Sequence, residues 1–294
     1  MAKTMMEHMM KGEGFIAALD QSGGSTPKAL KLYGINEDAY SNETEMFDLI
    51  HEMRARIIRS PAFTGDKVVG AILFEQTMDR DVEGIPTATY LWEKRGVVPF
   101  LKIDKGLEEE KNGCQMLKPI PGLDALLERA AEQGIFGTKE RSVISAADPM
   151  GISSVVAQQF ELGEKVLAAG MVPILEPEVT ISISDKIDAE AMLRDALLAG
   201  LETVSAPVML KLSLPTIDNA YKALVDHPKV IKVVALSGGY ARAEANEILA
   251  RNTGIIASFS RALSEGLTAQ MSDAEFDAAL AEAIDSIYRA SIAG

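Results

Sequence analysis

Residues 207–213, PVMLKLS, place a lysine in the middle of an apolar, strand-like run. Because side chains alternate between the two faces of a strand, Lys211 shares its face with Met209 and Ser213, and the flanking leucines share the other. We expect the leucines to face helices and Lys211 to face the interior of a sheet structure. Seven similar runs lie elsewhere in the chain: FIAALD (15–20), VVGAILF (68–74), VVPFLKID (97–104), KERSVIS (139–145), MVPILEPE (171–178), VIKVVALSGG (230–239) and IIASFSRA (255–262).

The spacing of these eight runs predicts the fold. They begin about every 34 residues, which suits the strand–helix unit of a closed (β/α)8 barrel. Helical patterns occupy the intervals, among them 153–169, which Gly170 follows, and 272–290, which opens with a Ser-Asp-Ala-Glu capping box. An open doubly wound sheet is the alternative, but eight evenly spaced units favour closure. We therefore expect residues 1–294 to form one α/β domain, a TIM-type (β/α)8 barrel.

Composition narrows the classes of partner. The 294 residues carry 29 Lys plus Arg against 43 Asp plus Glu, a formal charge of −14. The resulting pI near 4.8 argues against nucleic acid or an anionic membrane as the main partner. Cys114 is the one cysteine in the sequence, so we expect no internal disulfide and a reducing compartment. We see no targeting segment and no apolar run of membrane-spanning length, and we expect a cytoplasmic protein.

The same strand alternation gathers charged side chains on inward faces, mostly toward the C-terminal ends of the strands. That end is where barrel enzymes place their chemistry. Ion pairs buried in an interior add stability unreliably, so a balanced set from several strands indicates a functional site rather than a structural one. The acids of this set are Asp20, Asp104, Glu176 and Glu178, and the bases are Lys102, Lys139, Arg141 and Lys211.

Lys211 is the candidate nucleophile. Apolar neighbours remove its solvation, and Lys139 and Arg141 on nearby strands would add like charge. Both effects favour the neutral amine, which can attack a carbonyl. Glu176 and Glu178 share one face and could move protons, although an E-P-E sequence is also typical of an exposed rim loop.

Two loops have the composition of anion sites. Ser237-Gly238-Gly239 ends the seventh run and Arg261 follows the eighth, the place where barrel enzymes commonly bind phosphate, although Ser-Gly-Gly can also be a plain tight turn. The loop 21–28, QSGGSTPK, follows the first run and could hold a second anion, but it matches neither nucleotide-loop motif.

The histidines give no support for a metal site. They are scattered along the chain without ligand spacing, so we expect surface positions for them. They are His8, His51 and His227.

Eight strings in barrel order resemble the class I, Schiff-base-forming fructose-1,6-bisphosphate aldolases in their shorter bacterial form. The resemblance spans residues 12–263. No single string is decisive, but their order and positions together are specific. The strings are GFIAALDQSGGSTPKAL, ILFEQTMDR, GVVPFLKIDKG, FGTKERS, GMVPILEPEV, VMLKLSLPT, VVALSGGY and ASFSRAL.

The resemblance implies reversible cleavage of D-fructose 1,6-bisphosphate to dihydroxyacetone phosphate and D-glyceraldehyde 3-phosphate, in glycolysis and gluconeogenesis. By this resemblance Lys211 forms the imine with C2, Glu176 is the acid/base that dehydrates the carbinolamine, and Asp20 handles the C4 hydroxyl. Lys139 would position substrate and help to keep Lys211 neutral. Arg141 would support it together with the remaining carboxylate of the pair, Glu178.

The resemblance also implies how substrate is held. The 1-phosphate would bind Ser237, Gly238, Gly239 and Arg261. The 6-phosphate would bind Ser22, Ser25 and Lys102. Since the protonated imine is the electron sink, the resemblance implies no metal or organic cofactor, a small phosphosugar as partner, and a homo-oligomer as one possible state.

Three features depart from the family pattern. Ala29 follows Lys28 where animal members have an arginine, and Ser260 stands where the family often has glycine. Animal members end in a tail with a terminal tyrosine, whereas Tyr288 lies in a helical pattern. We therefore expect weaker binding of the 6-phosphate and give Tyr288 no role in proton exchange. The alternatives are a transaldolase-like enzyme that shares Lys211, a barrel isomerase that needs no nucleophilic amine, and a phosphosugar-binding barrel without turnover.

Overall fold

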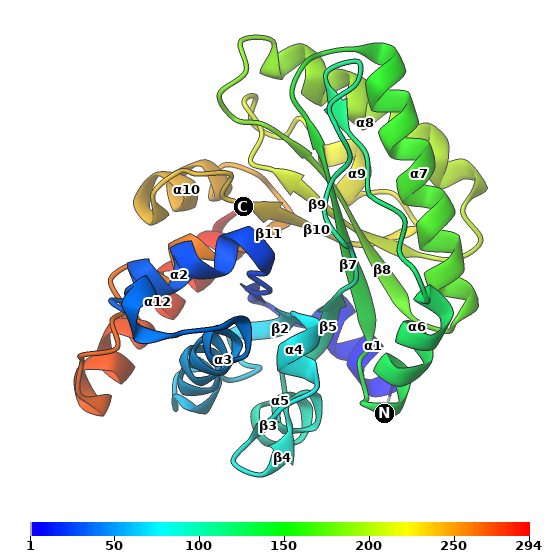
Figure 1. Ribbon diagram of the computed structural model, residues 1–294. Coiled ribbons are helices and arrows are strands. Elements are labelled where there is room, and N and C mark those ends of the chain that lie inside the picture. Colours follow the sequence, from blue (N-terminus) through cyan, green and yellow to red (C-terminus); the bar gives the residue numbers. More distant parts are fainter. Residues whose placement is uncertain (1) are drawn as a thin grey trace.

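Eight parallel strands form a nearly closed barrel in the computed structural model of the chain, which describes residues 2–294 (Figure 1). The first and last strands meet, since the Ala18 amide donates to the Phe259 carbonyl at 3.1 Å, just beyond the last strand. Each strand overlaps one of the eight predicted runs, so the predicted barrel is confirmed. In sheet order the strands are β1 (Phe15–Leu19), β2 (Val68–Leu73), β5 (Val98–Lys102), β7 (Gly137–Ile144), β8 (Val172–Val179), β9 (Val208–Ser213), β10 (Val230–Leu236) and β11 (Ile255–Ala257).

Helices surround the barrel, with α7 running beside β7 and β8 and packing against α8 (Figure 1). Short elements extend this plan: β6 (Cys114–Gln115) pairs antiparallel with β7, and β3 (Asp81–Val82) forms a small hairpin with β4 (Ile85–Pro86). The α-helices are α1 (Ala2–Lys11), α2 (Thr26–Leu32), α3 (Glu43–Arg59), α4 (Glu75–Met78), α5 (Thr87–Arg95), α6 (Leu123–Glu132), α7 (Pro149–Ala168), α8 (Lys186–Thr203), α9 (Lys222–Val225), α10 (Arg242–Leu249), α11 (Arg261–Ser264) and α12 (Asp273–Ala293).

The helix predicted over 153–169 differs from the structure mainly at its start, and the one predicted over 272–290 continues to Ala293. The α7 helix begins at Pro149, four residues before the predicted start, because the Asp148 carboxylate caps it by accepting the Met150 and Gly151 amides. Its end agrees, with Gly170 at a φ of +78° directly after the last turn. The predicted capping box of α12 is present between Ser272 and Glu275.

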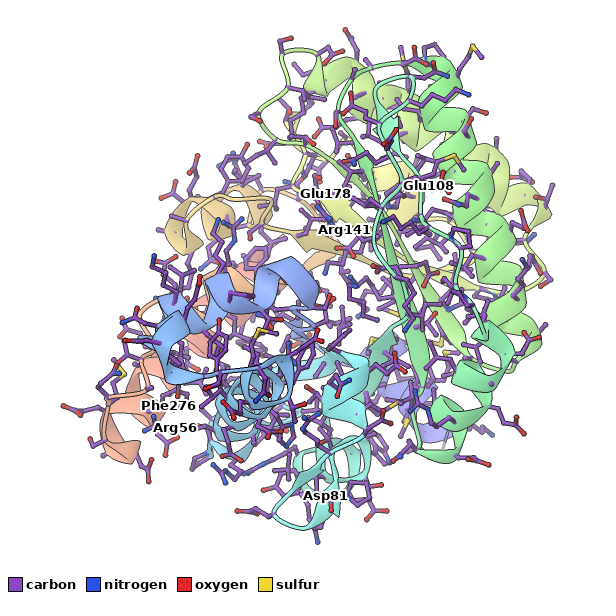
Figure 2. The ribbon with its side chains drawn as sticks, in the orientation of Figure 1. Arg56, Asp81, Glu108, Arg141, Glu178 and Phe276 are labelled. Atoms are coloured by element: carbon purple, nitrogen blue, oxygen red, sulfur yellow. The ribbon has the colours of Figure 1, made fainter. Side chains whose placement is uncertain are left out.

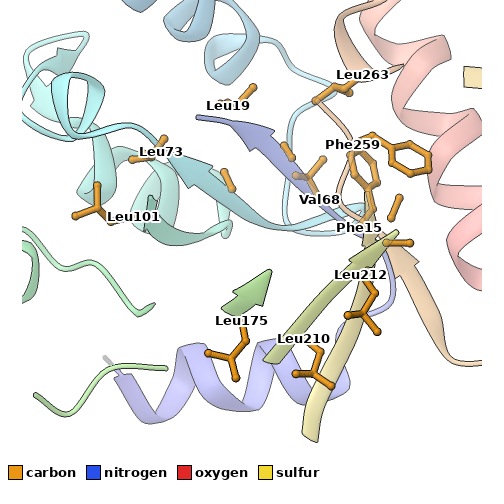
Figure 3. Packing of buried hydrophobic residues seen from close by; sticks show 14 of the residues in the cluster. Phe15, Leu19, Val68, Leu73, Leu101, Leu175, Leu210, Leu212, Phe259 and Leu263 are labelled. Carbon is orange, nitrogen blue, oxygen red and sulfur yellow. The ribbon is translucent and has the colours of Figure 1, made fainter. Parts of the chain in front are cut away.

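Alternation along the strands separates two apolar cores. Leu210 and Leu212 belong to the core between barrel and helices, and Met209 belongs to the one inside the barrel, as predicted. Figure 3 shows the first core where β1 meets the end of β11, with Phe15 and Phe259 close together. Fully burying one such side chain contributes about 1.5–3 kcal/mol.

The N-terminal methionine-rich segment closes the bottom of the barrel, a role that the sequence did not indicate. Met5 and Met9 of α1 are buried in the inner core with Phe100 and Ile174. This helix contacts β2, β5 and β10. The N-terminal end of the barrel is thus sealed by apolar packing, and the charged side chains lie toward the other end.

The surface position predicted for the histidines is wrong for His51. It is buried on α3, and its Nε2 lies 2.8 Å from the Asp81 carbonyl oxygen. His8 is half-buried with its ring edge against Trp92. None of the helices within residues 2–294 combines the length and apolar character needed to cross a membrane.

Candidate active site

A cavity of about 600 Å³ occupies the C-terminal mouth of the barrel. Every inward-facing charged residue that the alternation singled out lines it, although these residues come from five strands and the turns that follow them. The set is Asp20, Lys102, Asp104, Lys139, Arg141, Glu176, Glu178 and Lys211. The fold therefore brings four acids and four bases to one place.

Lys139 lies at the centre of this group. Its Nζ is 2.8 Å from Oδ2 of Asp20 and 2.8 Å from Oε2 of Glu176, and 4.0 Å from Oδ2 of Asp104. The Lys139 side chain is only 3% exposed, so these charges interact with little screening by water. One buried ammonium thus joins the carboxylates that follow β1 and β5 to one inside β8.

Glu176 also contacts Lys211. Its Oε1 lies 3.0 Å from the Lys211 Nζ, and both side chains are 5% exposed or less. The sequence predicted cationic neighbours for Lys211, but in the structure a carboxylate is its direct charged neighbour. The reason is the strand order: β8 lies between β7 and β9, so Glu176 separates Lys211 from the bases of β7.

Burial and charge oppose each other at these groups. Burial alone raises the pKa of Asp20 and of Glu176, but the Lys139 and Lys211 ammonium groups outweigh it and hold both pKa values below their usual range. Burial lowers the pKa of Lys139, and the surrounding carboxylates more than reverse this, so its pKa lies above the ordinary value. Both acids are therefore carboxylates at neutral pH, and Lys139 is a cation.

Two further pairs lie nearer the rim. Arg141 forms an ion pair with Glu178, and Figure 2 shows these two side chains next to each other at the barrel mouth. Lys102 Nζ lies 2.7 Å from Oδ1 of Asp104, whose Oδ2 accepts the Arg141 amide at 3.2 Å. The sequence predicts Asp104 among the inward acids, from its position two residues after Lys102, but gives no individual role for it.

The first predicted anion loop lies at the cavity. Ser237, Gly238 and Arg261 line it, together with Ser260. Gly238 has a φ of +62° and Gly239 a φ of +129°, values that favour glycine and turn the chain sharply after β10. Gly239 is exposed and lies just outside the lining, beside Arg261: a Cβ there would be 3.6 Å from Nη2 of the arginine.

The second predicted loop lies at the same mouth. Ser22 and Ser25 line the cavity, and so does Lys28, which was not among the predicted binding residues. The Ser25 hydroxyl donates to the Ser22 carbonyl at 2.9 Å and accepts the Ser22 amide at 2.9 Å, so it is held within the turn. The signal for Lys28 was its place in the predicted anion loop 21–28, and in the structure it lies in the first turn of α2.

Metal-ligating side chains are not clustered. Within residues 2–294, no three His, Cys, Asp or Glu side chains lie close enough together to hold a metal ion. Cys114 is buried in β6, where burial, assisted by the charges of Asp148 and Glu110, raises the pKa of its thiol to about 11. It therefore stays a thiol at neutral pH.

Solved structures show the fold of this chain in other proteins. Fructose-bisphosphate aldolase from Plasmodium falciparum, solved in complex with TRAP and an inhibitor, superposes with a TM-score of 0.81 at 19% identity, over 99% of this chain and 94% of that one. An archaeal fructose 1,6-bisphosphate aldolase superposes with a TM-score of 0.56 at 14% identity, over 97% and 99%. At these identities the likeness concerns the barrel fold.

Sequence comparison identifies the family. The family described as "Fructose-bisphosphate aldolase class-I" matches residues 1–207. A protein of Porphyromonas gingivalis named fructose-bisphosphate aldolase class 1 is 57% identical over 292 residues, which cover 99% of this chain and all of that protein. The chain belongs to the class I fructose-bisphosphate aldolase family.

Proposed function

We propose that this chain catalyses the reversible cleavage of D-fructose 1,6-bisphosphate to dihydroxyacetone phosphate and D-glyceraldehyde 3-phosphate through an imine on Lys211. The observation that carries the proposal is the buried contact between the Lys211 amine and the Glu176 carboxylate, at 3.0 Å. Their cavity of about 600 Å³ lies within the range of small-molecule sites, roughly 300–1,000 Å³. It can admit a sugar bisphosphate.

Glu176 is placed to manage the protons of imine formation. It accepts a proton from the Lys211 ammonium, and the free amine attacks the C2 carbonyl and forms the carbinolamine. The protonated Glu176 then returns its proton to the C2 hydroxyl, which leaves as water. The products of this step are a protonated imine on Lys211 and a Glu176 carboxylate. The step therefore begins and ends with one positive charge on Lys211 and one negative charge on Glu176.

Asp20 is placed for the cleavage itself. Its lowered pKa keeps it ionised, and it takes the C4 hydroxyl proton while the electrons of the C3–C4 bond move into the imine. Glyceraldehyde 3-phosphate leaves and an enamine stays on Lys211. Protonation of the enamine at C3 and hydrolysis of the imine release dihydroxyacetone phosphate.

Lys139 acts as a positioning charge between these two carboxylates. It lies 2.8 Å from each, so a single cation fixes the acid/base of imine formation relative to the base of cleavage. Arg141 and Glu178 extend the charged set toward the rim. Because the group is buried and prearranged, little reorganisation is needed during the reaction.

The phosphates are assigned to the two loops at the mouth. The 1-phosphate binds backbone amides around Gly238 and Gly239, the Ser237 hydroxyl and the Arg261 guanidinium. For the 6-phosphate we propose Ser22, Ser25, Lys102 and, in addition, Lys28. Since the Ser25 hydroxyl is held in its turn, the Ser22 hydroxyl and the Lys28 ammonium are the groups best placed to reach the ligand.

A turnover assay with a matched variant tests the proposal. The unaltered protein should cleave fructose 1,6-bisphosphate in the presence of EDTA. Lys211→Arg keeps the positive charge but cannot form an imine at neutral pH, so cleavage should vanish while phosphosugar binding largely survives. Substantial cleavage by Lys211→Arg would contradict the assignment. A panel of acceptor aldehydes would distinguish a transaldolase-like enzyme.

A further inference from the structure

A second arginine, outside the charged group described above, is buried behind the loop that follows β1. Arg54 of α3 is 0% exposed, and its guanidinium donates to the Gln21 carbonyl, to Oε1 of Gln21 at 3.3 Å and to the Thr77 hydroxyl at 2.6 Å. All three acceptors are neutral oxygens, and its Nε–H has no hydrogen-bond partner. A buried cation held this way is costly, and neither the fold nor the proposed chemistry accounts for it.

Arg54 acts on the site through Gln21. Gln21 directly follows Asp20, so the bond to its backbone carbonyl fixes the chain at the proposed cleavage base. Burial lowers the pKa of Arg54 to about 10, and the nearby Asp20 charge opposes this lowering. At neutral pH the guanidinium is therefore charged and holds its acceptors in place.

The Gln21 side chain continues the connection across the mouth of the barrel. Its Nε2 donates to the Ser260 hydroxyl at 2.7 Å, a contact between residues 239 positions apart in the sequence. Ser260 directly precedes Arg261, the first residue of the short α11 helix. With its oxygen on Arg54 and its nitrogen on Ser260, the amide has one favourable orientation and ties the loop after β1 to the loop after β11.

We infer that the Arg54–Gln21–Ser260 chain sets the separation of the two anion loops and thereby favours a substrate with a phosphate at each end. The inference rests on the proposed function, which gives one phosphate to each loop. Gln21 lines the cavity but acts through the loops it joins, so it is a positioning residue that determines specificity. A substrate with one phosphate occupies only one of the loops, so its binding does not depend on the separation between them.

The test compares two substrates in one variant. Gln21→Met keeps the side-chain length and the backbone carbonyl bound by Arg54, but loses both side-chain hydrogen bonds. We expect kcat/KM for fructose 1,6-bisphosphate to fall about tenfold, the effect of one lost hydrogen-bonding partner, and kcat/KM for fructose 1-phosphate to fall less than about twofold. Equal losses for the two substrates, or no loss for either, would overturn the inference.

Two further variants separate positioning from general damage. Gln21→Glu keeps an acceptor for Arg54 and for the Ser260 hydroxyl, so the preference for the bisphosphate should return to within about threefold of the original. Arg56→Ala removes an arginine of the same helix that faces α12, where it pairs with Asp273 and lies over the Phe276 ring (Figure 2). It should lower the melting temperature and leave the substrate ratio unchanged. A changed ratio in Arg56→Ala, or no recovery in Gln21→Glu, would count against the inference.

Assays of the unaltered protein separate a failure of the proposed function from a failure of the Arg54–Gln21–Ser260 chain. If it cleaves neither substrate, the proposed function fails. If it cleaves both and Gln21→Met leaves their ratio unchanged, only the role of the Arg54–Gln21–Ser260 chain fails.

Discussion

The Nζ of Lys211 lies 3.0 Å from Oε1 of Glu176, and both groups are buried at the C-terminal end of the barrel. A nucleophilic amine must lose a proton before it attacks, and the nearest group able to accept one is this carboxylate. The other oxygen of Glu176 lies 2.8 Å from Lys139, so the carboxylate is fixed from two sides. The geometry gives proton transfer at Lys211 a short path.

Removing the proton-carrying ability of Glu176 should slow imine formation. Glu176→Gln keeps the size of the side chain but cannot accept or deliver a proton at neutral pH. We expect kcat to fall by about 10²–10⁴-fold, and the fraction of Lys211 that does react to stop at the carbinolamine, because its dehydration needs the same acid. Intact mass spectrometry detects the carbinolamine as an adduct that retains the water lost from an imine. Glu161→Gln, at an exposed pair with Lys165, is the control and should turn over normally. An unchanged rate in Glu176→Gln would refute this role.

Lys139→Met should destabilise the fold strongly, because it leaves the buried carboxylates of Asp20 and Glu176 without their shared cation. We expect the free energy of unfolding, measured with urea at pH 7, to be about 3–5 kcal/mol lower than that of the original protein. The pKa values of both acids lie below their usual range in the original protein, so the stability they confer is present at neutral pH and is lost as pH falls through those lowered values. The difference in the free energy of unfolding between the original protein and Lys139→Met should accordingly become smaller below about pH 4. Lys165→Met, at an exposed pair, should cost about 1 kcal/mol or less.

Glu140 should make the stability of the fold depend on pH in the opposite direction. Its side chain is fully buried, and burial raises its pKa to about 8, so the folded protein keeps a proton that the unfolded chain releases above about pH 4.3. Stability should therefore fall as pH rises from about 4.3 to 8. Glu140→Gln removes this loss and should stabilise the protein by about 3 kcal/mol at pH 7, and by less at pH 5. Urea unfolding at both pH values checks it, and a pH-independent difference would show that Glu140 does not titrate in this way.

Arg261 should matter for binding more than for folding. Arg261→Ala removes the guanidinium from the loop after β11, and the KM for fructose 1,6-bisphosphate should rise about 10–100-fold. Arg251→Ala, at an exposed pair with Asp218, is the matched control and should change KM by less than about twofold. Similar KM values for the two variants would remove Arg261 from the phosphate site.

The barrel was predictable because its strands are short apolar runs at regular intervals. The largest difference in extent is at β11, which ends at Ala257, whereas its predicted run extends to residue 262. Beyond Ala257 the chain leaves the sheet and enters α11 at Arg261, so the apolar character of Phe259 does not extend the strand. Single-sequence patterns also gave no reason to expect α1 as the seal of the barrel, because that contact depends on the tertiary fold.

The charged group was predictable from alternation, and its internal pairing was not. Alternation gives the face on which Lys211 and Glu176 lie, but their contact depends on the order of the strands around the barrel. Arg54 did leave a signal: Ile50, Met53 and Ile57 lie around it at helical spacing, so it occupies the apolar face of α3. An arginine on such a face is expected to be buried. Only the structure identifies Gln21 as its partner.

The most direct test of the account is borohydride reduction with dihydroxyacetone phosphate and EDTA present, followed by intact and peptide mass spectrometry. Reduction converts an imine into a stable secondary amine, so the account predicts a single covalent adduct located on Lys211. An unmodified Lys211 in a protein that demonstrably binds the ligand would contradict the account and would favour an isomerase or a binding protein built on the same barrel.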